Sequence, residues 1–135
     1  MKNMNFANLF TGIGVWDLAA QELGYNLIFQ CEYDKKKSEF LKTKFPNVPN
    51  LGDICNTNFS NYKNKIDVLT ISDPCTTITH AGKRNYESSP NYLWRQAFRA
   101  ISEIKPTVIL CENAANRANT DFDSIPVFGF AFVVD

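Results

Sequence analysis

The sequence predicts an α/β fold with a mainly parallel sheet. Two observations support this prediction: short apolar segments alternate with longer segments of helical apolar spacing, and glycine-containing or polar turns follow the apolar segments. Such alternation is typical of parallel strands joined by right-handed crossovers. We expect strands at residues 6–10, 26–30, 66–71, 107–111 and 129–134, and helices at residues 15–23, 35–45 and 93–104.

The composition fits one domain spanning residues 1–135. Of the 135 residues, 44% are hydrophobic and 11 are Phe, which is enough for a single core. The net charge is zero, so no overall basic field argues for nucleic-acid binding. No apolar run approaches membrane-spanning length, and residues 1–5 lack a signal segment. We therefore expect a cytoplasmic protein that does not bind membranes.

The cysteines and the histidine give no metal-binding pattern. Cys31, Cys55, Cys75 and Cys111 form no Cys-x-x-Cys pair, and His80 is close in sequence only to Cys75. Zinc sites need several such ligands at short spacing. The sequence therefore predicts no metal site.

The first strand leads into a glycine turn, Thr11-Gly12-Ile13-Gly14, and then into a helix whose end fits Gly24. A strand, a Gly-x-Gly turn and a helix together form the entrance to a nucleotide-type site. Glycines let the backbone approach a ligand, and a helix N-terminus favours an anionic group. The same turn also occurs as a plain connection between elements, so this motif alone leaves both interpretations open.

An acidic residue stands where the second strand ends. Glu32 follows Gly12 by about 20 residues, the usual spacing of a ribose-binding acid in a βαβ nucleotide fold. The alternative is an exposed acid that pairs with nearby lysines, but the spacing favours the ribose interpretation. Tyr33, next in the chain, offers an aromatic face to a base.

The next segment is less informative. The helix at residues 35–45 carries several lysines, which we interpret as a solvated face, and Pro46 ends it. Residues 48–51 form a candidate short edge strand. Asp53 is either a turn residue or a hydrogen-bond acceptor for a ligand amine, and the sequence leaves these two roles open.

The segment at residues 66–84 organises the rest of the chain. A buried strand is followed by Ser72-Asp73-Pro74-Cys75, and Pro74 ends the strand because it has no N–H to donate. Cys75 then lies at a strand end, where a substrate can reach its thiol. The alternative for a free cysteine is a small buried hydrophobe. Glu112 directly follows the next strand, so a nucleophile and an acid meet at one sheet edge, as in an active site.

Taken together, these segments resemble the DNA cytosine-5 methyltransferase family. The resemblance runs through nearly all of this chain but only the first half of the family's catalytic core. It implies a Rossmann-like, S-adenosylmethionine-dependent methyltransferase fold. The matching motifs, in order, are Phe10-Thr11-Gly12-Ile13-Gly14, Glu32-Tyr33-Asp34, Gly52-Asp53-Ile54, Pro74-Cys75 with Ala81-Gly82-Lys83, Leu93-Trp94 and Glu112-Asn113.

The resemblance also implies roles for individual residues. Cys75 would attack C6 of a cytosine flipped out of DNA, and Glu112 would bond the N3 edge of that base. Methyl transfer to C5 would use S-adenosylmethionine. The expected cofactor contacts are Phe10 and Tyr33 on the adenine, Glu32 on the ribose, Asp53 on the adenine amine, Gly12 and Gly14 at the methionine end, and further contacts from Ile54, Pro74 and Leu93.

The sequence also departs from the family pattern. Thr76 replaces the usual Gln, Ala114 replaces the usual Val, and Asp73 places a carboxylate near the thiol, which should raise the pKa of Cys75. The family's later motifs and target-recognition domain have no counterpart, so the domain is expected to be truncated. Without the family's antiparallel partner strand, residues 129–134 should pair directly beside residues 107–111.

Two functions are consistent with these features. The first is a DNA methylation module of restriction-modification type that needs a second methyltransferase subunit to act on DNA. The alternative is an inactive, methyltransferase-like binding module, phage-encoded, that regulates or inhibits a host protein. A degenerate fragment without chemistry is a third interpretation, and the joint retention of Glu32, Cys75 and Glu112 weighs against it.

Overall fold

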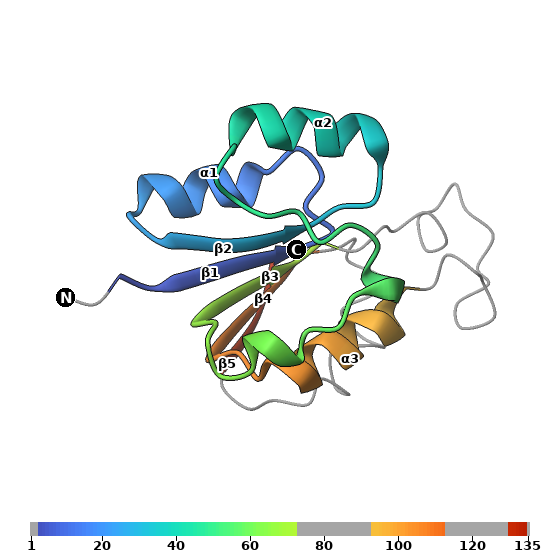
Figure 1. The fold of residues 1–135 in the computed structure, drawn as a ribbon. Helices are drawn as coiled ribbons and strands as arrows, with labels where there is room; N and C mark the ends of the chain where they lie inside the picture. Colours follow the sequence, from blue (N-terminus) through green and yellow to red (C-terminus); the bar gives the residue numbers. More distant parts are fainter. Residues whose placement is uncertain (1–2, 73–92, 113–129, 135) are drawn as a thin grey trace.

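The computed structural model describes residues 3–72, 93–112 and 130–134 (Figure 1). The expected α/β fold is confirmed. The strands are β1 (Asn5–Leu9), β2 (Asn26–Cys31), β3 (Val68–Ile71), β4 (Val108–Glu112) and β5 (Phe130–Val134); the helices are α1 (Val15–Glu22), α2 (Lys35–Lys44) and α3 (Trp94–Ile104), with short 3-10 turns η1 (Ile54–Asn56) and η2 (Ser60–Tyr62).

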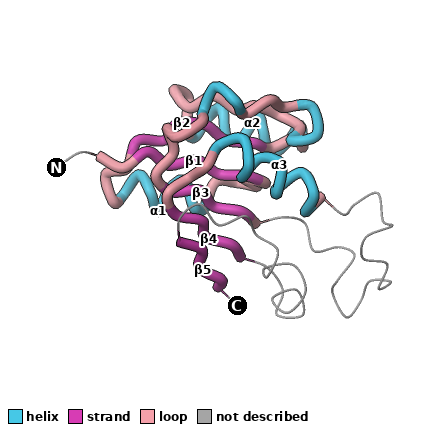
Figure 2. The backbone as a smooth tube through the Cα atoms, turned by 90° about the horizontal axis from the view of Figure 1, so that it is seen from below, coloured by secondary structure: helices cyan, strands magenta, loops and turns pink. Residues whose placement is uncertain are grey.

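The described strands form one parallel sheet in the order β2-β1-β3-β4-β5 (Figure 2). Neighbours in this order run in the same direction, so their carboxyl ends share one edge of the sheet. The last strand pairs directly beside β4, as expected from the sequence. The polar residues that follow β1, β2 and β3 are thereby brought to that common edge.

Helices α1 and α3 cover opposite faces of the sheet (Figure 1). On the α1 face, Ala20 packs with Phe6 and Val68. On the α3 face, the apolar side of the helix packs against alternate strand residues such as Leu9 and Leu69, which gives the larger core. The buried residues of α3 are Trp94, Ala97, Ala100, Ile101 and Ile104.

One expected strand is not present. Residues 48–51 make a single bridge, between Gln30 and Asn50, instead of a strand. Pro49 explains the difference, because it has no N–H to continue a ladder, although its carbonyl accepts from Gln30 N–H at 2.9 Å. The sequence at residues 125–128 also allows a short helix, and these residues lie outside those that the structure describes. Within the described ranges, no helix is long and apolar enough to cross a membrane.

Candidate functional site

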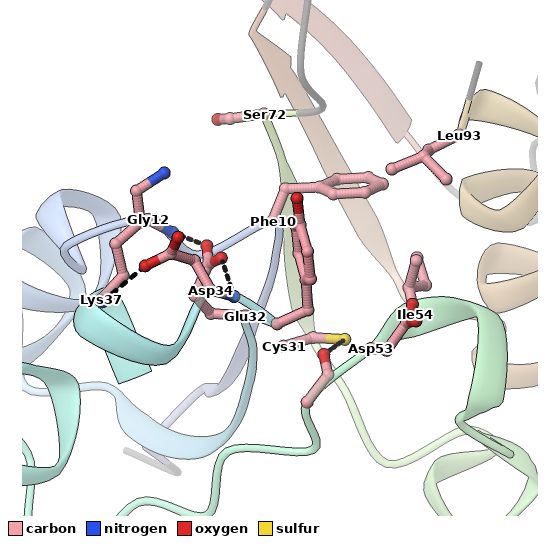
Figure 3. A pocket seen from close by; sticks show the side chains of 12 residues that line it. Phe10, Gly12, Cys31, Glu32, Asp34, Lys37, Asp53, Ile54, Ser72 and Leu93 are labelled. Carbon is pink, nitrogen blue, oxygen red and sulfur yellow. Dashed lines mark hydrogen bonds between the residues drawn. The ribbon is translucent and has the colours of Figure 1, made fainter. Parts of the chain in front are cut away.

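A cavity of about 390 Å³ opens at the carboxyl ends of the strands (Figure 3). This volume is in the usual range for small-molecule sites, and strand ends are where open α/β sheets bind ligands. The cavity is bordered by the residues after β1 and β2, the loop before η1, the end of β3 and the start of α3. Its lining residues are Phe10, Gly12, Cys31, Glu32, Tyr33, Asp34, Lys37, Gly52, Asp53, Ile54, Ser72 and Leu93.

The turn after β1 has an unusual backbone that its sequence permits. Phe10, Gly12 and Gly14 all have positive φ, at 55°, 61° and 81°. Thr11 holds this turn to β2, because its hydroxyl accepts from Cys31 N–H at 2.9 Å and donates to Asn8 O at 3.0 Å. A Cβ built on Gly12 would meet no atom of the described residues within 4 Å, so among these residues the space in front of this backbone is open.

Gly14 has a different role from Gly12. It is the N-cap of α1 and does not line the cavity. A Cβ at Gly14 would lie 2.7 Å from the Phe45 ring and 2.9 Å from the Leu41 side chain. Gly14 therefore allows α1 and α2 to approach each other closely behind the site.

Glu32 has a fixed carboxylate at the cavity wall. Its side chain is buried, and its Oε2 accepts from Gly12 N–H at 2.7 Å while Oε1 accepts from Asp34 N–H at 3.0 Å. Asn50 holds the backbone of the same residue by accepting from Glu32 N–H at 2.9 Å. Because each carboxylate oxygen has a second acceptor position, Glu32 can still accept hydrogen bonds from ligand hydroxyls.

Aromatic and apolar side chains form another part of the wall. Phe10 is half-buried, packs against the core and borders the cavity together with Ile54 and Leu93 (Figure 3). Tyr33 lines the cavity from the end of β2 and is 72% exposed. These side chains offer a surface that can flank a planar base.

Asp53 has both features that the sequence left open, a turn contact and a carboxylate that a ligand can reach. Its Oδ1 accepts from Cys55 N–H at 2.9 Å, which caps η1, and the same exposed carboxylate lines the cavity. Ile54 is held by α3, because its carbonyl accepts a hydrogen bond from Arg99 Nη2 at 2.6 Å. The turn role is therefore present, and the carboxylate remains accessible to a ligand.

The lining cysteine is not a nucleophile. The Cys31 thiol donates to Gly52 O at 3.2 Å, and burial raises the pKa of this thiol to about 12. A thiol with this pKa stays protonated at neutral pH, whereas a nucleophilic cysteine needs the thiolate.

The structure brings together most, but not all, of the residues that the sequence singled out. Phe10, Gly12, Glu32, Tyr33, Asp53, Ile54 and Leu93 line one cavity. Glu112 lies exposed at the end of β4 and is not among the lining residues. Pro74 and Cys75 lie outside the described residues, so their predicted roles stay predictions.

Five lining residues have no ligand-binding role in the prediction from sequence: Cys31, Asp34, Lys37, Gly52 and Ser72. Lys37 was assigned to a solvated lysine face, but it lies in the first turn of α2, where its N–H donates to Asp34 Oδ1 at 2.9 Å. Its position in the first turn of the helix that follows β2 is the available signal. Ser72, the last residue before Asp73, accepts a hydrogen bond from Trp16 Nε1 at 3.1 Å, and no local pattern indicates such a distant pair.

The sequence is similar to those of known type II methyltransferases. Over 122 residues the chain is 33% identical to the type II methyltransferase M.PspPI of Psychrobacter sp. (strain TA137), a match that covers 89% of this chain and 29% of that protein. It is 30% identical over 122 residues to the type II methyltransferase M.HhaI of Haemophilus parahaemolyticus, covering 90% and 37% of the two chains. The chain thus spans about a third of the length of these relatives.

A solved structure shows the same fold. It is a crystal structure of a proposed DNA modification methyltransferase encoded within an E. coli prophage, with a TM-score of 0.68, 22% sequence identity, and coverage of 91% of this chain and 35% of that one. The family profile described as C-5 cytosine-specific DNA methylase matches residues 4–125, which is most of the chain. The expected resemblance is confirmed: this chain belongs to the C-5 cytosine-specific DNA methylase family.

Proposed function

We propose that this chain is the cofactor-binding part of a DNA cytosine-5 methyltransferase that uses S-adenosylmethionine. One observation carries the proposal. The Glu32 carboxylate is held by the backbone N–H groups of Gly12 and Asp34 at the wall of a cavity of about 390 Å³, and its oxygens can accept further hydrogen bonds from a ligand. Family membership supports DNA cytosine methylation as the reaction class. Because the relatives are about three times longer, the activity of the whole enzyme is part of the proposal.

The residues present fit the proposed cofactor. Glu32 would accept hydrogen bonds from the ribose hydroxyls, and Phe10 and Tyr33 would flank the adenine. Asp53 has an exposed carboxylate suited to an amine, while Ile54 and Leu93 add apolar contacts. The open space in front of Gly12 allows the methionine end of the cofactor to approach the backbone. When bound, S-adenosylmethionine supplies an electrophilic methyl group.

The chemistry on the base would come from residues after two neighbouring strands. In this proposal the Cys75 thiolate attacks C6 of the target cytosine, which makes C5 nucleophilic. The Glu112 carboxyl would bond the N3 edge and stabilise the charge that develops on the ring. The parallel pairing of β3 with β4 supports this pairing of roles, because both strands end at the same edge of the sheet.

Binding of S-adenosylmethionine to a Glu32→Gln variant tests the cofactor site. An amide retains only one acceptor oxygen, so one of the two backbone N–H groups loses its partner and the ribose loses a charged acceptor. We expect titration calorimetry to show affinity weakened by about 1–3 kcal/mol. Glu39→Gln, which removes the same charge from an exposed position on α2, is the matched control and should bind like the wild type. Absence of binding heat for folded wild-type protein at millimolar cofactor would refute the cofactor site.

A second candidate function is a binding module without catalysis. Asp73, two residues before Cys75, favours it, because a neighbouring carboxylate disfavours the thiolate. In this case the chain would regulate a partner protein, and a phage origin is one source of such a module. Retained cofactor binding together with an unreactive Cys75 thiol would support this function over the enzyme module. A cytoplasmic location and a second methyltransferase subunit stay predictions under either function.

A further inference from the structure

A row of polar side chains is fully buried on the α1 face of the sheet. Asn8 on β1, Gln30 on β2, Thr70 on β3 and Asp17 on α1 are each 0% exposed. Asn8 is in register with Gln30 on one side and with Thr70 on the other. The row therefore crosses three adjacent strands at one level, directly beneath the first turn of α1.

These side chains are joined through the carboxylate of Asp17. Asn8 Nδ2 donates to Asp17 Oδ2 at 2.6 Å, and Gln30 Nε2 donates to Asp17 Oδ1 at 2.9 Å. Thr70 Oγ1 extends the chain by donating to Asn8 Oδ1 at 2.8 Å. Both oxygens of the buried acid thus accept from amides on two different strands.

The orientation of the Gln30 amide is set by its hydrogen bond to Asp17. Gln30 Oε1 is buried and has no hydrogen-bond partner in the described structure. The amide of Gln30 is turned so that its N–H groups reach Asp17, although this leaves its own carbonyl oxygen unsatisfied. A buried ionisable group and an unsatisfied acceptor both oppose stability, so stability alone does not explain why a carboxyl stands here.

The network lies directly behind the candidate site. Two residues beyond Asn8, Gln30 and Thr70, just past the ends of β1, β2 and β3, are Phe10, Glu32 and Ser72. Phe10 has a left-handed backbone, and its side chain packs against the core on the α3 face, so the link to the polar row is one of chain position and not of a shared face. These three residues line the cavity, one at the end of each strand. Asp17 itself follows the glycine turn by one helical turn. It therefore ties the start of α1 to the three strand ends that hold the site.

We propose that Asp17 is a positioning residue for the S-adenosylmethionine site. It fixes β1, β2 and β3 relative to the start of α1, and this sets the 2.7 Å hydrogen bond between Gly12 N–H and Glu32 Oε2. It acts through the strands and touches no ligand. The part of this inference that concerns the cofactor rests on the proposed function, whereas the part that concerns the geometry of the turn does not.

The test compares Asp17→Leu with the exchanged double variant Asn8→Asp/Asp17→Asn. Leu has the same branched shape, with larger methyl groups in place of the carboxylate oxygens, and offers no acceptor. The exchange restores the network, because Asp at position 8 accepts from Thr70 and from Asn at position 17, whose own oxygen accepts from Gln30. Two quantities are measured: the Gly12 amide resonance in the ligand-free protein by ¹H–¹⁵N NMR, and the dissociation constant for S-adenosylmethionine by calorimetry. Asp17→Asn alone replaces Asp17→Leu if the latter does not fold.

Asp17→Leu should move the Gly12 resonance and weaken binding roughly tenfold, and the exchange should restore both to near the wild-type values. The control is Ile104→Ala, a buried change at the end of α3 far from Leu93, which lowers stability without touching the network. It should leave the Gly12 resonance and the affinity unchanged. An unmoved Gly12 resonance in Asp17→Leu, an equal loss of affinity in Ile104→Ala, or a folded exchange variant that restores neither quantity would overturn the proposal. If the wild type binds no cofactor, the proposed function fails, and the Gly12 resonance still decides the positioning role.

Discussion

Gly12 and Gly14 occupy the same turn but are constrained by different physical effects. Gly12→Ala places a Cβ in open space, so only the positive φ of 61° opposes it, at about 1 kcal/mol. Gly14→Ala adds contacts of 2.7 and 2.9 Å with Phe45 and Leu41, two buried side chains that have little room to move. We expect Gly14→Ala to lower the free energy of unfolding by about 2–4 kcal/mol, measured by urea denaturation.

For cofactor binding we expect the reverse order: Gly12→Ala should lower the affinity more than Gly14→Ala does. Gly12 lines the cavity and Gly14 does not. If Gly12→Ala proved as destabilising as Gly14→Ala, the close approach of α1 and α2 at Gly14 would not be the cause of the larger loss.

Asp17 should make stability depend on pH. Burial raises the pKa of Asp17 above its ordinary value of 3.8, and hydrogen bonds from Asn8 and Gln30 only partly offset this. The folded state therefore holds the Asp17 proton more tightly than the unfolded chain does. The resulting contribution to stability is complete below the unfolded pKa and is lost as the pH rises through the folded pKa.

Asp17→Asn removes this titration. The unfolding free energy of the wild type should therefore fall relative to that of Asp17→Asn as the pH rises from about 3 to 7. Denaturation curves at several pH values measure the difference, and Glu39→Gln corrects for the loss of one surface charge. A difference that stays constant across this range would show that Asp17 titrates alike in the folded and unfolded states.

At the scale of elements, Arg99 connects α3 to the loop that carries part of the site. Its guanidinium donates to Ile54 O at 2.6 Å and Thr57 O at 2.8 Å, and it pairs with Glu103 Oε1 at 3.0 Å. The same group lies 5.6 Å from the centroid of the Phe59 ring. These contacts hold η1 in place, and with it Asp53 and Ile54.

Arg99→Met should lower the free energy of unfolding by about 2 kcal/mol, because two carbonyl groups lose a charged donor. The ion pair adds little, since both side chains are about a third exposed. Thermal unfolding is the measurement, and Lys63→Met, which removes an exposed cation, is the control. A loss no larger than that of the control would show that η1 is held by its apolar contacts alone.

Local patterns predicted the elements well where their physical cause is local. β-branched runs indicated β3 and β4, and the spacing from Gly12 indicated Glu32. Residues 48–51 did not form a strand, because one proline outweighs the apolar character of that segment. Arg99 with Ile54, Trp16 with Ser72 and the Asp17 network join residues that are distant in sequence, so they leave no local pattern and only the folded structure shows them.

Across the whole molecule, the chain carries the proposed cofactor site and the proposed nucleophile but no net positive charge for binding DNA. It spans 29% and 37% of the length of M.PspPI and M.HhaI. Its net charge is zero, whereas binding to duplex DNA draws much of its free energy from cations that neutralise phosphates. In the proposed function this chain would hold the cofactor and supply the nucleophile, and we expect a separate basic surface to hold the duplex.

A methyl-transfer assay tests whether this chain needs a further polypeptide to act on DNA. The 135-residue chain alone should transfer no tritiated methyl group from S-adenosylmethionine to mixed-sequence DNA. Transfer should appear when a polypeptide with the remaining part of the family's catalytic domain is added. Cys75→Ser should then abolish it by removing the nucleophile. The matched control is Cys55→Ser, which changes an exposed cysteine outside the cavity lining and should leave transfer intact. Methylation by the chain alone would show that the duplex needs no further surface, and transfer by Cys75→Ser would exclude Cys75 as the nucleophile.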